Sequence, residues 1–309
     1  MSLVNVIVPC YNGEKYLDRF FLSLKEQTFK DFDIFVVDDG STDNSKDVIN
    51  KYKEIFAKEN IELNYFHKEN GGAASAVNVA LKQNLTGKYL LIIDCDDEIT
   101  QDSLEKKVDF IEKNPAYGAV TSYYEFIDND TNQTLKIHEV RGITVNRAQT
   151  FENILLARDV VFAGYLFNKE KLFSVLQDGQ IYESRGGQNW QLLLPIAYNF
   201  PIGVIKEVLY KYYVIKSSHS HSVKKTREAF EKKYKTHKEI LDETLKRMNV
   251  YKYYAKFVER YVSYHLAGLS YRINDKNMMK EYYKRYRKAG FFNFRLFVKY
   301  VLMSCGLKR

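Results

Sequence analysis

The chain has 309 residues, of which 45% are hydrophobic and 15% aromatic, so it can bury a large core and global disorder is not expected. Its three cysteines, Cys10, Cys95 and Cys305, lie far apart, which favours free thiols in a reducing compartment over a disulfide framework. The net charge of +8 is uneven, because residues 226–309 carry a net +13 and residues 1–225 a net −5. This asymmetry predicts two regions with different partners.

The first hundred residues alternate between apolar runs of strand length and amphipathic helical patterns. One predicted helix face is formed, at i, i+3, i+4 and i+7 spacing, by Leu17, Phe20, Phe21 and Leu24. Strands are predicted at residues 4–8, 32–37, 61–66 and 89–93, with helices around residues 17–24, 48–56 and 73–83. Strands separated by helices of this length indicate a parallel α/β sheet.

Beyond residue 115 the alternation is less regular. Strands are expected at residues 117–126, 134–140 and 204–214, and helices at 149–157, 169–176 and 190–198. From residue 226 onward every segment has a helical pattern without proline, so we expect a domain over residues 1–225 and a basic helical region over residues 226–309. No apolar run reaches about 20 residues and no signal peptide is visible, so we expect no membrane span and a cytoplasmic protein.

Three carboxylates, those of Asp94, Asp96 and Asp97, follow the buried strand predicted at residues 89–93. Ligand sites in open α/β sheets lie just beyond the carboxyl ends of strands. Like charges held this close repel each other, and a cation such as Mg²⁺ or Mn²⁺, which prefers carboxylate oxygens and substrate phosphates, would relieve the repulsion. The alternative is an acidic turn that caps a helix beginning near Ser103.

Two other predicted strands end in polar segments that would complete a nucleotide site. Residues 9–14 read Pro-Cys-Tyr-Asn-Gly-Glu, and residues 38–43 read Asp-Asp-Gly-Ser-Thr-Asp. Tyr11 can stack on a base, and a carboxylate can accept from the base N–H or the ribose hydroxyls. No Gly-x-Gly-x-x-Gly and no Gly-Lys-Ser/Thr segment occurs, so a Rossmann dinucleotide site and a P-loop are unsupported. The alternatives are a turn role for Tyr11 and cap or turn roles for Asp38 and Asp39.

In these segments the sequence resembles the family 2 glycosyltransferases with the GT-A fold. The matching segments are residues 6–12, residues 36–43, Asn70-Gly71-Gly72 and the acidic turn at 94–97, in the order and spacing of the family. The likeness is firm over the first hundred residues and absent from the basic region. It implies a Rossmann-like, mostly parallel mixed sheet flanked by helices, a nucleotide-sugar donor, a divalent metal and an inverting mechanism.

Carried over position by position, the resemblance implies a donor pocket with a metal. Asp39 would bind the base edge, with uracil N3–H as the expected group. Asp94 would face the ribose or a metal-bound water, and is also a candidate metal ligand. Asp96, alone or together with Asp97, would hold Mn²⁺ or Mg²⁺. The cation would offset the charge that builds on the leaving diphosphate. The full set of implied donor-site residues is Pro9, Tyr11, Asn12, Glu14, Asp39, Asn78 and Asp94.

The chain departs from the family pattern at two places. Residues 76–78 read Ala-Val-Asn where the family has Ala-Arg-Asn, so a cation near the donor is missing. Gln188 and Asn189 stand where the family has its acidic general base, and an amide cannot accept a proton there. Glu183 or Asp97 could supply the base instead, or the acceptor could already be ionised.

Two further segments carry side chains suited to the acceptor and to the metal. With an amide at the base position, Gln188, Asn189 and Trp190 are expected to bind acceptor sugar, although Trp190 could equally pack the start of a helix. His219 follows the last predicted strand, where some relatives place a histidine near the metal, and imidazole suits Mn²⁺. A polar linker is the other interpretation of this histidine segment.

The basic region ends in a charged helix followed by an apolar segment. Residues 291–303 are mostly apolar but too short to span a bilayer. Arg295 and Lys299 lie four residues apart on one side, which predicts an interfacial helix on an anionic membrane surface. Packing on the catalytic domain, or on a second subunit in a homodimer, is the alternative. Nucleic acid is not expected, because no recognition motif accompanies the charge.

The sequence therefore predicts an enzyme that transfers a sugar from a nucleotide sugar, with a UDP-sugar as the expected donor, to a glycan or lipid-linked acceptor. Such an enzyme would build a bacterial surface polysaccharide or a similar glycan. The amides at residues 188 and 189 leave a second interpretation, a nucleotide-sugar-binding protein without transferase activity. A nucleotidyltransferase is disfavoured, because residues 9–15 lack the Gly-rich, Lys- or Arg-bearing loop that it needs.

Overall fold

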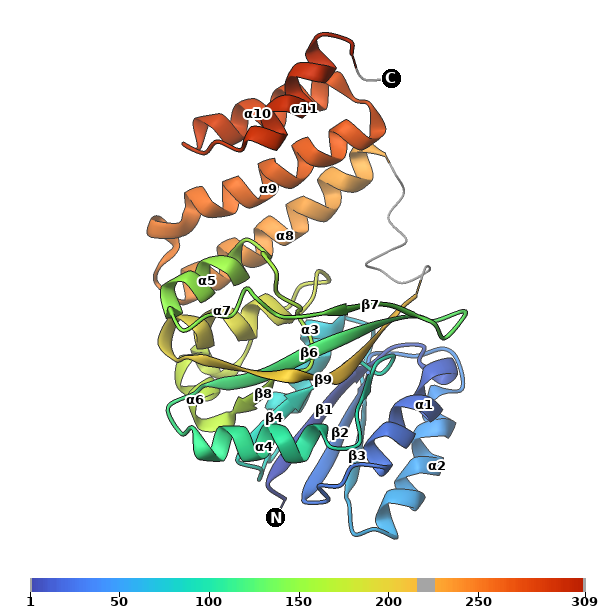
Figure 1. Ribbon diagram of the computed structural model, residues 1–309. Helices are drawn as coiled ribbons and strands as arrows, with labels where there is room; N and C mark the ends of the chain where they lie inside the picture. Colours follow the sequence, from blue (N-terminus) through green and yellow to red (C-terminus); the bar gives the residue numbers. More distant parts are fainter. Residues whose placement is uncertain (1, 216–225, 308–309) are drawn as a thin grey trace. The chain divides into compact units, whose positions relative to one another are not determined.

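The computed structural model describes residues 2–215 and 226–307, and the chain divides into two compact units, Met1–Ile215 and Lys216–Arg309 (Figure 1). The first unit combines a sheet with helices, whereas the described residues of the second form only helices. The two units are described separately below. The predicted boundary between residues 225 and 226 stays a prediction.

Nine strands of the described residues form one mixed sheet in the first unit, in the order β3-β2-β1-β4-β8-β6-β9-β5, with β7 paired to β6. β3, β2, β1 and β4 are parallel neighbours, and β8 is antiparallel to both β4 and β6. The strands are β1 (Val4–Cys10), β2 (Phe32–Asp38), β3 (Leu63–His67), β4 (Tyr89–Ile92), β5 (Glu98–Ile99), β6 (Ala119–Asp128), β7 (Thr134–His138), β8 (Leu166–Asn168) and β9 (Ile202–Val214).

Helices flank this sheet, and apolar spacing explains their placement. The four residues predicted to form one face of α1 are all buried, and small residues let α3 lie close on β1 and β2. The helices of the described first unit are α1 (Glu14–Lys25), α2 (Ser45–Ala57), α3 (Ala73–Leu81), α4 (Ser103–Lys113), α5 (Arg147–Leu155), α6 (Lys169–Val175), a 3₁₀ turn (Gln177–Gly179) and α7 (Asn189–Asn199).

The sequence does not predict two of the strands, β5 and β8. They contain two and three residues, too few to show a period of two. β8 exists because it fills the position between β4 and β6, and β5 because it pairs with the long strand β9. Pairing partners supplied from distant parts of the chain therefore decide these two elements.

The carboxyl ends of β2, β1 and β4 lie side by side at one edge of the sheet. The parallel register pairs Cys10 with Asp38 and Ile7 with Ile92, so the segments that follow these strands leave the sheet together. Every residue of β1 and β4 is buried, as expected for strands covered on both faces. This edge is where ligands bind in open α/β sheets.

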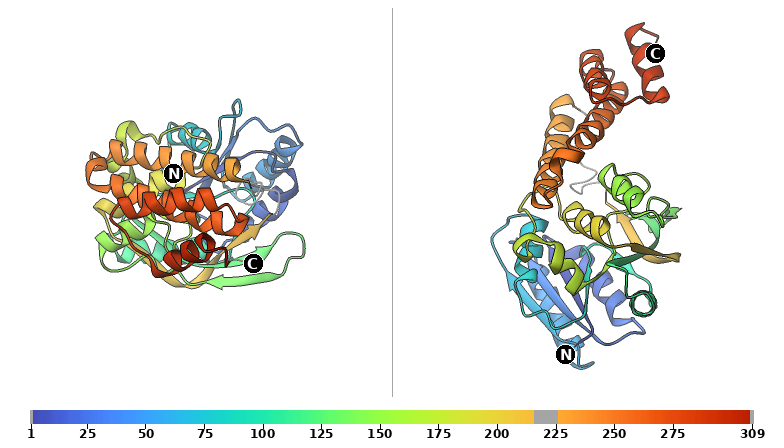
Figure 2. Two further views of the ribbon diagram at one scale, coloured as in Figure 1. Left: turned by 90° about the horizontal axis from the view of Figure 1, so that it is seen from above. Right: turned by 90° about the vertical axis from the view of Figure 1, so that its left-hand side faces the viewer.

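The second unit consists of four helices in its described part (Figure 2). α9 packs against α8 and α10, and α11 packs on α9 and α10. Thr226, Asp275 and Asn293 each cap a helix by accepting a backbone N–H. In residues 2–215 and 226–307, no helix is both long and apolar enough to cross a membrane. The helices are α8 (Arg227–Arg247), α9 (Tyr251–Ile273), α10 (Lys276–Lys288) and α11 (Phe294–Ser304).

Candidate active site

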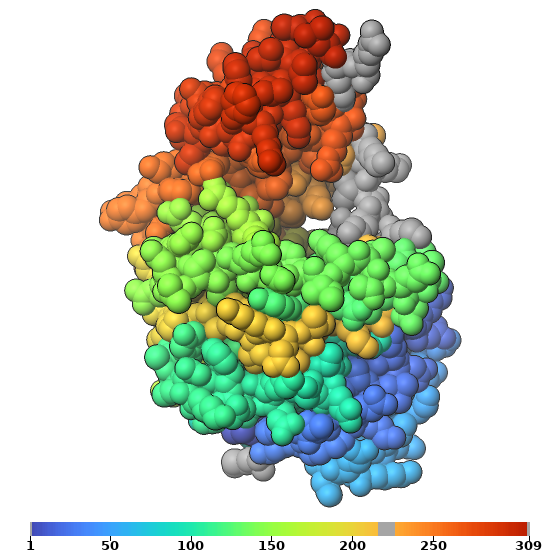
Figure 3. Space-filling model, viewed as in Figure 1, coloured from blue at the N-terminus to red at the C-terminus, as the bar shows by residue number. Residues whose placement is uncertain are grey.

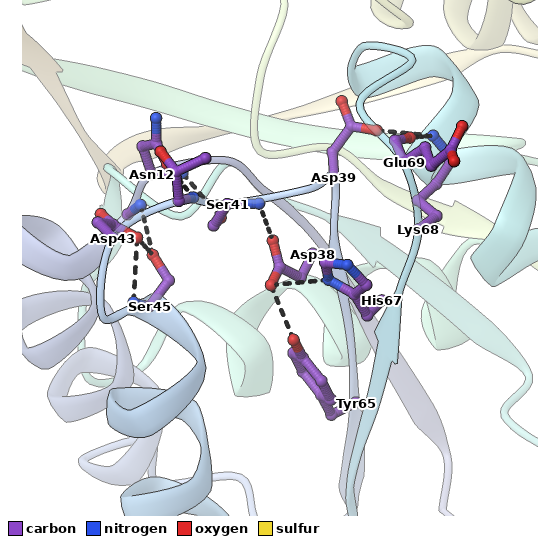
Figure 4. Close-up of polar contacts among 12 residues, drawn as sticks. Asn12, Asp38, Asp39, Ser41, Asp43, Ser45, Tyr65, His67, Lys68 and Glu69 are labelled. Carbon is purple, nitrogen blue, oxygen red and sulfur yellow. Dashed lines mark hydrogen bonds and ion pairs between the residues drawn. The ribbon is translucent and has the colours of Figure 1, made fainter.

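The turns that follow β1 and β2 are joined by hydrogen bonds between side chains and backbone (Figure 4). Ser41 Oγ accepts from the Asn12 N–H at 2.9 Å, and Asn12 Oδ1 accepts from the Thr42 N–H at 2.8 Å. Asn12 has a φ of 50°, in the left-handed region that asparagine tolerates better than most residues. Asn12, which the sequence placed in the donor pocket, thus fixes the two turns relative to each other.

One carboxylate joins the first turns of α1 and α2. Asp43 Oδ2 accepts from the Glu14 N–H at 3.1 Å, and Asp43 Oδ1 accepts from the Ser45 N–H at 3.0 Å. The free N–H groups of a helix start favour such an anion. Glu14 Oε1 accepts in turn from Asn44 Nδ2 at 2.8 Å. The Glu14 side chain is therefore engaged by the turn after β2.

Asp38 stabilises the turn that follows β2 and links it to β3. Its carboxylate accepts from the Ser41 N–H at 2.8 Å and from the Tyr65 hydroxyl at 2.7 Å, and it lies 3.3 Å from His67 Nδ1 (Figure 4). Burial by itself would raise the pKa of Asp38, but these hydrogen bonds outweigh it and hold the pKa below its usual value. All its contacts are internal, which fits a structural role.

Asp39 organises the turn after β3. Lys68 Nζ lies 2.7 Å from Asp39 Oδ1 (Figure 4). Oδ1 also accepts from the Gly71 N–H at 2.9 Å, and Oδ2 accepts from the Gly72 N–H at 2.6 Å. Gly72 has a φ of 93°, which strains any other residue. Two carboxylate oxygens offer about four acceptor positions. The three bonds described here leave one acceptor position on Oδ2 of this buried carboxylate.

Tyr11 is the exposed member of the predicted donor pocket. Its side chain is 46% exposed at the end of β1, whereas Pro9 and Cys10 are buried. A Cβ added at Gly13 would come within 2.9 Å of Cys10 Sγ and 3.1 Å of Cys95 Sγ. The acidic turn that contains Cys95 therefore lies directly against the end of β1. The ring of Tyr11 is open for a base to stack on it.

Burial and mutual repulsion disfavour charge in the acidic turn. Burial, together with the nearby charge of Asp96, raises the pKa of Asp94 to about 7. Burial also raises the pKa of Asp96, although its own backbone N–H and Arg19 oppose the effect. Two adjacent carboxylates that resist ionisation lack a full compensating charge, and a cation would supply it.

Asp97 points into the protein. It is only 2% exposed, and its carboxylate accepts from the Tyr210 hydroxyl at 2.7 Å and from the Tyr213 N–H at 3.0 Å. Burial, followed by the charges of Asp96 and Asp94, raises the pKa of Asp97 well above its usual value. These contacts tie the acidic turn to β9. They favour a supporting role for Asp97 over that of a base reaching the acceptor.

Arg19 is a residue that the motifs did not reveal. Its guanidinium donates to Asp96 O at 2.6 Å, pairs with Glu98 at 3.1 Å and lies 3.4 Å from the centre of the Tyr213 ring. Nη1 also donates to Asn129 Oδ1 at 3.2 Å. Arg19 thus holds the backbone of the acidic turn against β5 and β9. It lies off the apolar face of α1, so the spacing of apolar residues gave no signal for it.

The segment before α7 reaches the acidic turn. Gln188 is buried, and its Nε2 donates to Asp94 Oδ1 at 3.3 Å. Asn78 holds the same segment, since its amide group exchanges hydrogen bonds of 2.8 Å and 3.0 Å with the backbone of Ile181. Asn78 Nδ2 also lies 3.3 Å from Oε1 of the exposed Glu183. The structure therefore brings Gln188 to Asp94 and gives Asn78 a positioning contact.

Arg185, in the segment before α7, contacts the turn beside Asp39. Arg185 Nη1 donates to Asn70 Oδ1 at 2.9 Å, and Arg185 Nη2 donates to Asn70 O at 3.1 Å. A Cβ added at Gly72 would lie 3.3 Å from Arg185 Cα, so the two backbones approach closely. Arg185 gave no sequence signal, because nothing in its own segment indicates a partner 115 residues away.

The two residues expected to bind acceptor begin α7. Asn189 is its first residue and is partly exposed. Trp190 Nε1 donates to Ile154 O at 2.9 Å, and its ring packs edge-on against Phe162 with centroids 5.0 Å apart. Trp190 therefore packs the start of a helix, the alternative that the sequence left open.

Whether the acidic turn can hold a metal ion depends on the side chains that it offers as ligands. Within the described ranges no group of three or more His, Cys, Asp or Glu side chains is arranged to hold a metal ion. Mg²⁺, however, commonly takes one or two carboxylates and completes its shell with substrate phosphates and water. Asp94 and Asp96, with their uncompensated charge, fit such an ion. His219, the third predicted ligand, lies outside the described residues.

More than half of the chain, residues 5–173, matches the family model described as Glycosyl transferase family 2. The chain belongs to this family. The predicted family membership is thus confirmed, and the matched range includes β1, β2, the acidic turn and Asn78.

Curated relatives of this chain are also named as glycosyltransferases. An uncharacterized glycosyltransferase of Haemophilus influenzae is 35% identical over 133 residues, which cover 43% of this chain and 51% of the relative. A poly(ribitol-phosphate) β-N-acetylglucosaminyltransferase of Staphylococcus aureus, TarS, is 37% identical over 116 residues, which cover 37% of this chain and 20% of TarS. The chain thus spans about half or less of the length of these relatives.

Solved structures show the fold. TarS 1–349 in complex with UDP-GlcNAc has a TM-score of 0.59 at 20% identity and covers 94% of this chain and 90% of that one. The mannosyltransferase PcManGT of Pyrobaculum calidifontis, in complex with GDP-Man and Mn²⁺, has a TM-score of 0.55 at 18% identity, with 98% and 84% covered. These likenesses confirm the predicted GT-A fold and, at such low identity, the fold alone.

Proposed function

We propose that this protein is a metal-dependent, inverting glycosyltransferase that uses a UDP-sugar and a glycan or lipid-linked acceptor. One observation carries the proposal: Tyr11, Asp39 and the Asp94–Asp96 pair follow three neighbouring parallel strands and meet at one sheet edge. Two solved structures with this fold contain UDP-GlcNAc and GDP-Man, respectively. We further propose a cytoplasmic location, because every cysteine is a free thiol.

On the donor side, each group has a distinct task. The exposed ring of Tyr11 stacks on the base, and the remaining acceptor position of Asp39 Oδ2 takes a base N–H. Asp94 and Asp96 hold the Mn²⁺ or Mg²⁺, which when bound stabilises the charge on the leaving diphosphate. Arg19 and Asp97 keep these two carboxylates in place. Pro9, Asn12, Glu14 and Asn78 shape the pocket through the turns they hold.

On the acceptor side, the general base must be a residue other than the two amides at positions 188 and 189. Gln188 and Asn189 offer amide groups that suit sugar hydroxyls but take no proton. Glu183 is the exposed carboxylate of this segment, and Asn78 orients it from 3.3 Å. We therefore propose Glu183 as the base and Gln188 as a group that aligns Asp94 and the acceptor.

Calorimetry with UDP and Mn²⁺ tests the donor site. We expect Asp96→Ala to weaken Mn²⁺-dependent UDP binding at least tenfold, because one of two metal carboxylates is lost. Asp109→Ala, which removes an exposed carboxylate paired with Lys113 on α4, is the matched control and should bind as the unmodified protein does. Equal affinity in the Asp96 variant would remove the metal assignment.

The amides at the base position favour a second candidate, a nucleotide-sugar-binding protein that transfers nothing. Donor hydrolysis or transfer, measured as UDP release with a panel of glycan acceptors, separates the two. For the enzyme we expect activity that Glu183→Gln lowers by about 10²-fold or more, with UDP binding unchanged. UDP binding without any UDP release, in both the unmodified protein and the Glu183→Gln variant, would support the second candidate.

A further inference from the structure

Helix α11 presents an apolar face to solvent. Phe294, Phe297 and Val298 are 68%, 38% and 38% exposed, and Phe292 just before the helix is 58% exposed. Residues at i, i+3 and i+4 share one side of a helix, so the three helical residues form a stripe. Only Leu296 and Met303 of α11 are buried. A surface helix normally turns its polar side outward, so this stripe, which we call the α11 face, is unusual.

Helices α10 and α11 are rich in cations, and one of them lies against an aromatic ring beside the α11 face. Helices α10 and α11 contain eight Lys and Arg residues and one acid, Glu281, which already pairs with Arg227 at 2.7 Å. The guanidinium of Arg287 lies 5.1 Å from the ring centre of Phe292, and Arg295 is exposed on α11 itself. Further exposed cations along α10 are Lys276, Lys280, Lys284 and Lys288.

We propose that the α11 face docks on the surface of a membrane that contains anionic lipids. Aromatic and aliphatic side chains would enter the boundary between headgroups and acyl chains, while the cations contact the headgroups. α11 has 11 residues, so it lies in the interface and does not cross it. The inference goes beyond the proposed function, because it requires neither donor binding nor transfer.

Charge argues against a second copy of the chain as the occupant. A symmetric dimer through the α11 face would place the same patch against itself. The cations of two α10–α11 pairs would then meet like charges, which is costly. An anionic lipid surface supplies the opposite charge together with an apolar layer. The membrane therefore satisfies both features of the face, and a second copy satisfies only one.

Co-sedimentation of the full chain with lipid vesicles tests the proposal. We expect binding to vesicles of phosphatidylcholine with phosphatidylglycerol, weak binding to phosphatidylcholine alone, and loss of binding at high salt. Phe294→Ser with Val298→Ser should weaken binding at least tenfold. Arg287→Gln with Arg295→Gln should weaken it by roughly fivefold for each charge. Equal binding to neutral and anionic vesicles would overturn the proposal.

The matched control is Leu135→Ser, which removes an apolar side chain of similar exposure, 53%, from β7 on the surface of the first unit (Figure 3). It should bind vesicles as the unmodified chain does. Far-ultraviolet circular dichroism must show unchanged helix content in each variant. A drop in vesicle binding with Leu135→Ser equal to that of the α11 variant would count against the α11 face.

Tryptophan fluorescence provides a second test, which gives a positive signal when α11 contacts lipid and does not depend on a variant that loses binding. Trp190 in the first unit is the single tryptophan of the chain, so Phe294→Trp adds one reporter on α11. Its emission should shift to shorter wavelength with anionic vesicles and stay unchanged with neutral ones. Light scattering that shows a dimer dispersed by Phe294→Ser would assign the face to a second copy. UDP binding, measured in parallel, keeps a failure here separate from a failure of the donor site.

Discussion

At the scale of one residue, Arg185 supplies a cation near the proposed donor site that the sequence did not predict. Residues 76–78 lack the arginine that the family places near the donor, which suggested a missing cation. The guanidinium of Arg185 comes from another segment and is fixed by two hydrogen bonds to Asn70, in the turn just before α3. The neighbouring Gly71 and Gly72 bind Asp39, so the cation lies close to the group proposed to bind the base.

We predict that Arg185→Gln raises the KM for the nucleotide sugar about five- to tenfold, which corresponds to one charge-assisted hydrogen bond. kcat should change less, and the melting temperature should stay the same because Arg185 is exposed. Steady-state UDP release measures both constants. Arg141→Gln, which removes an exposed arginine paired with Glu139, is the control. An unchanged KM would show that Arg185 only holds the turn.

At the scale of one element, helix α4 contains a buried lysine. Lys107 is fully buried, and its Nζ donates to Gly164 O at 2.9 Å. Burial lowers the pKa of Lys107 from 10.5 to about 7. The helical pattern around residue 103 predicted α4, but a lysine on its inner face contradicts the usual spacing of apolar residues. The carbonyl of Gly164, brought next to α4 by the chain between β6 and β8, makes it possible.

Between pH 7 and pH 10 the unfolded chain keeps the Lys107 proton and the folded chain does not, so the free energy of unfolding rises with pH in this window. We predict that Lys107→Met removes this rise and adds roughly 1–4 kcal/mol to the free energy of unfolding at pH 7. Urea unfolding at pH 7 and pH 9.5 measures both. Lys113→Met, on the exposed side of α4, should change neither. A less stable Lys107 variant would contradict the prediction.

At the scale of the molecule, two histidines make the stability of the helical unit sensitive to acid. The partly buried His237 and His265 lie among aromatic rings of α8 and α9. His237 Nδ1 is 3.0 Å from the Tyr261 hydroxyl, and His265 stacks on Tyr234 with centroids 5.4 Å apart. Burial, then the charge of Lys233, lowers the pKa of each histidine to about 4. The helical unit therefore resists protonation at both positions.

Above pH 6.5 both histidines are neutral in either state, so their contribution is constant. Between pH 6.5 and pH 4 the unfolded chain binds these protons first, and the helical unit loses stability, by up to about 3 kcal/mol for each histidine. We predict that His265→Phe removes about half of this loss in urea unfolding followed by circular dichroism. His67→Gln, in the first unit, should leave it unchanged. UDP with Mn²⁺ should stabilise only the transition of the first unit.

Most of the sheet edge followed from local sequence. The apolar strands at residues 4–8, 32–37 and 89–93, and the polar segments after them, could be identified because a buried parallel strand needs an unbroken apolar run. The segments that follow these three strands therefore leave the sheet at the same edge. β5 and β8 could not be predicted, because two or three residues show no period and long-range pairing defines them.

The sequence by itself determined the family, the α/β class, the acidic turn and the uneven charge, because each depends on residues that are neighbours along the chain. Tertiary structure decided what those residues contact. It turned Asp97 inward to Tyr210, brought Arg19 and Arg185 to the site, and placed Gln188 against Asp94. It also left the apolar side of α11 exposed. Such contacts join positions far apart in sequence, and a local pattern contains no information about its distant partner.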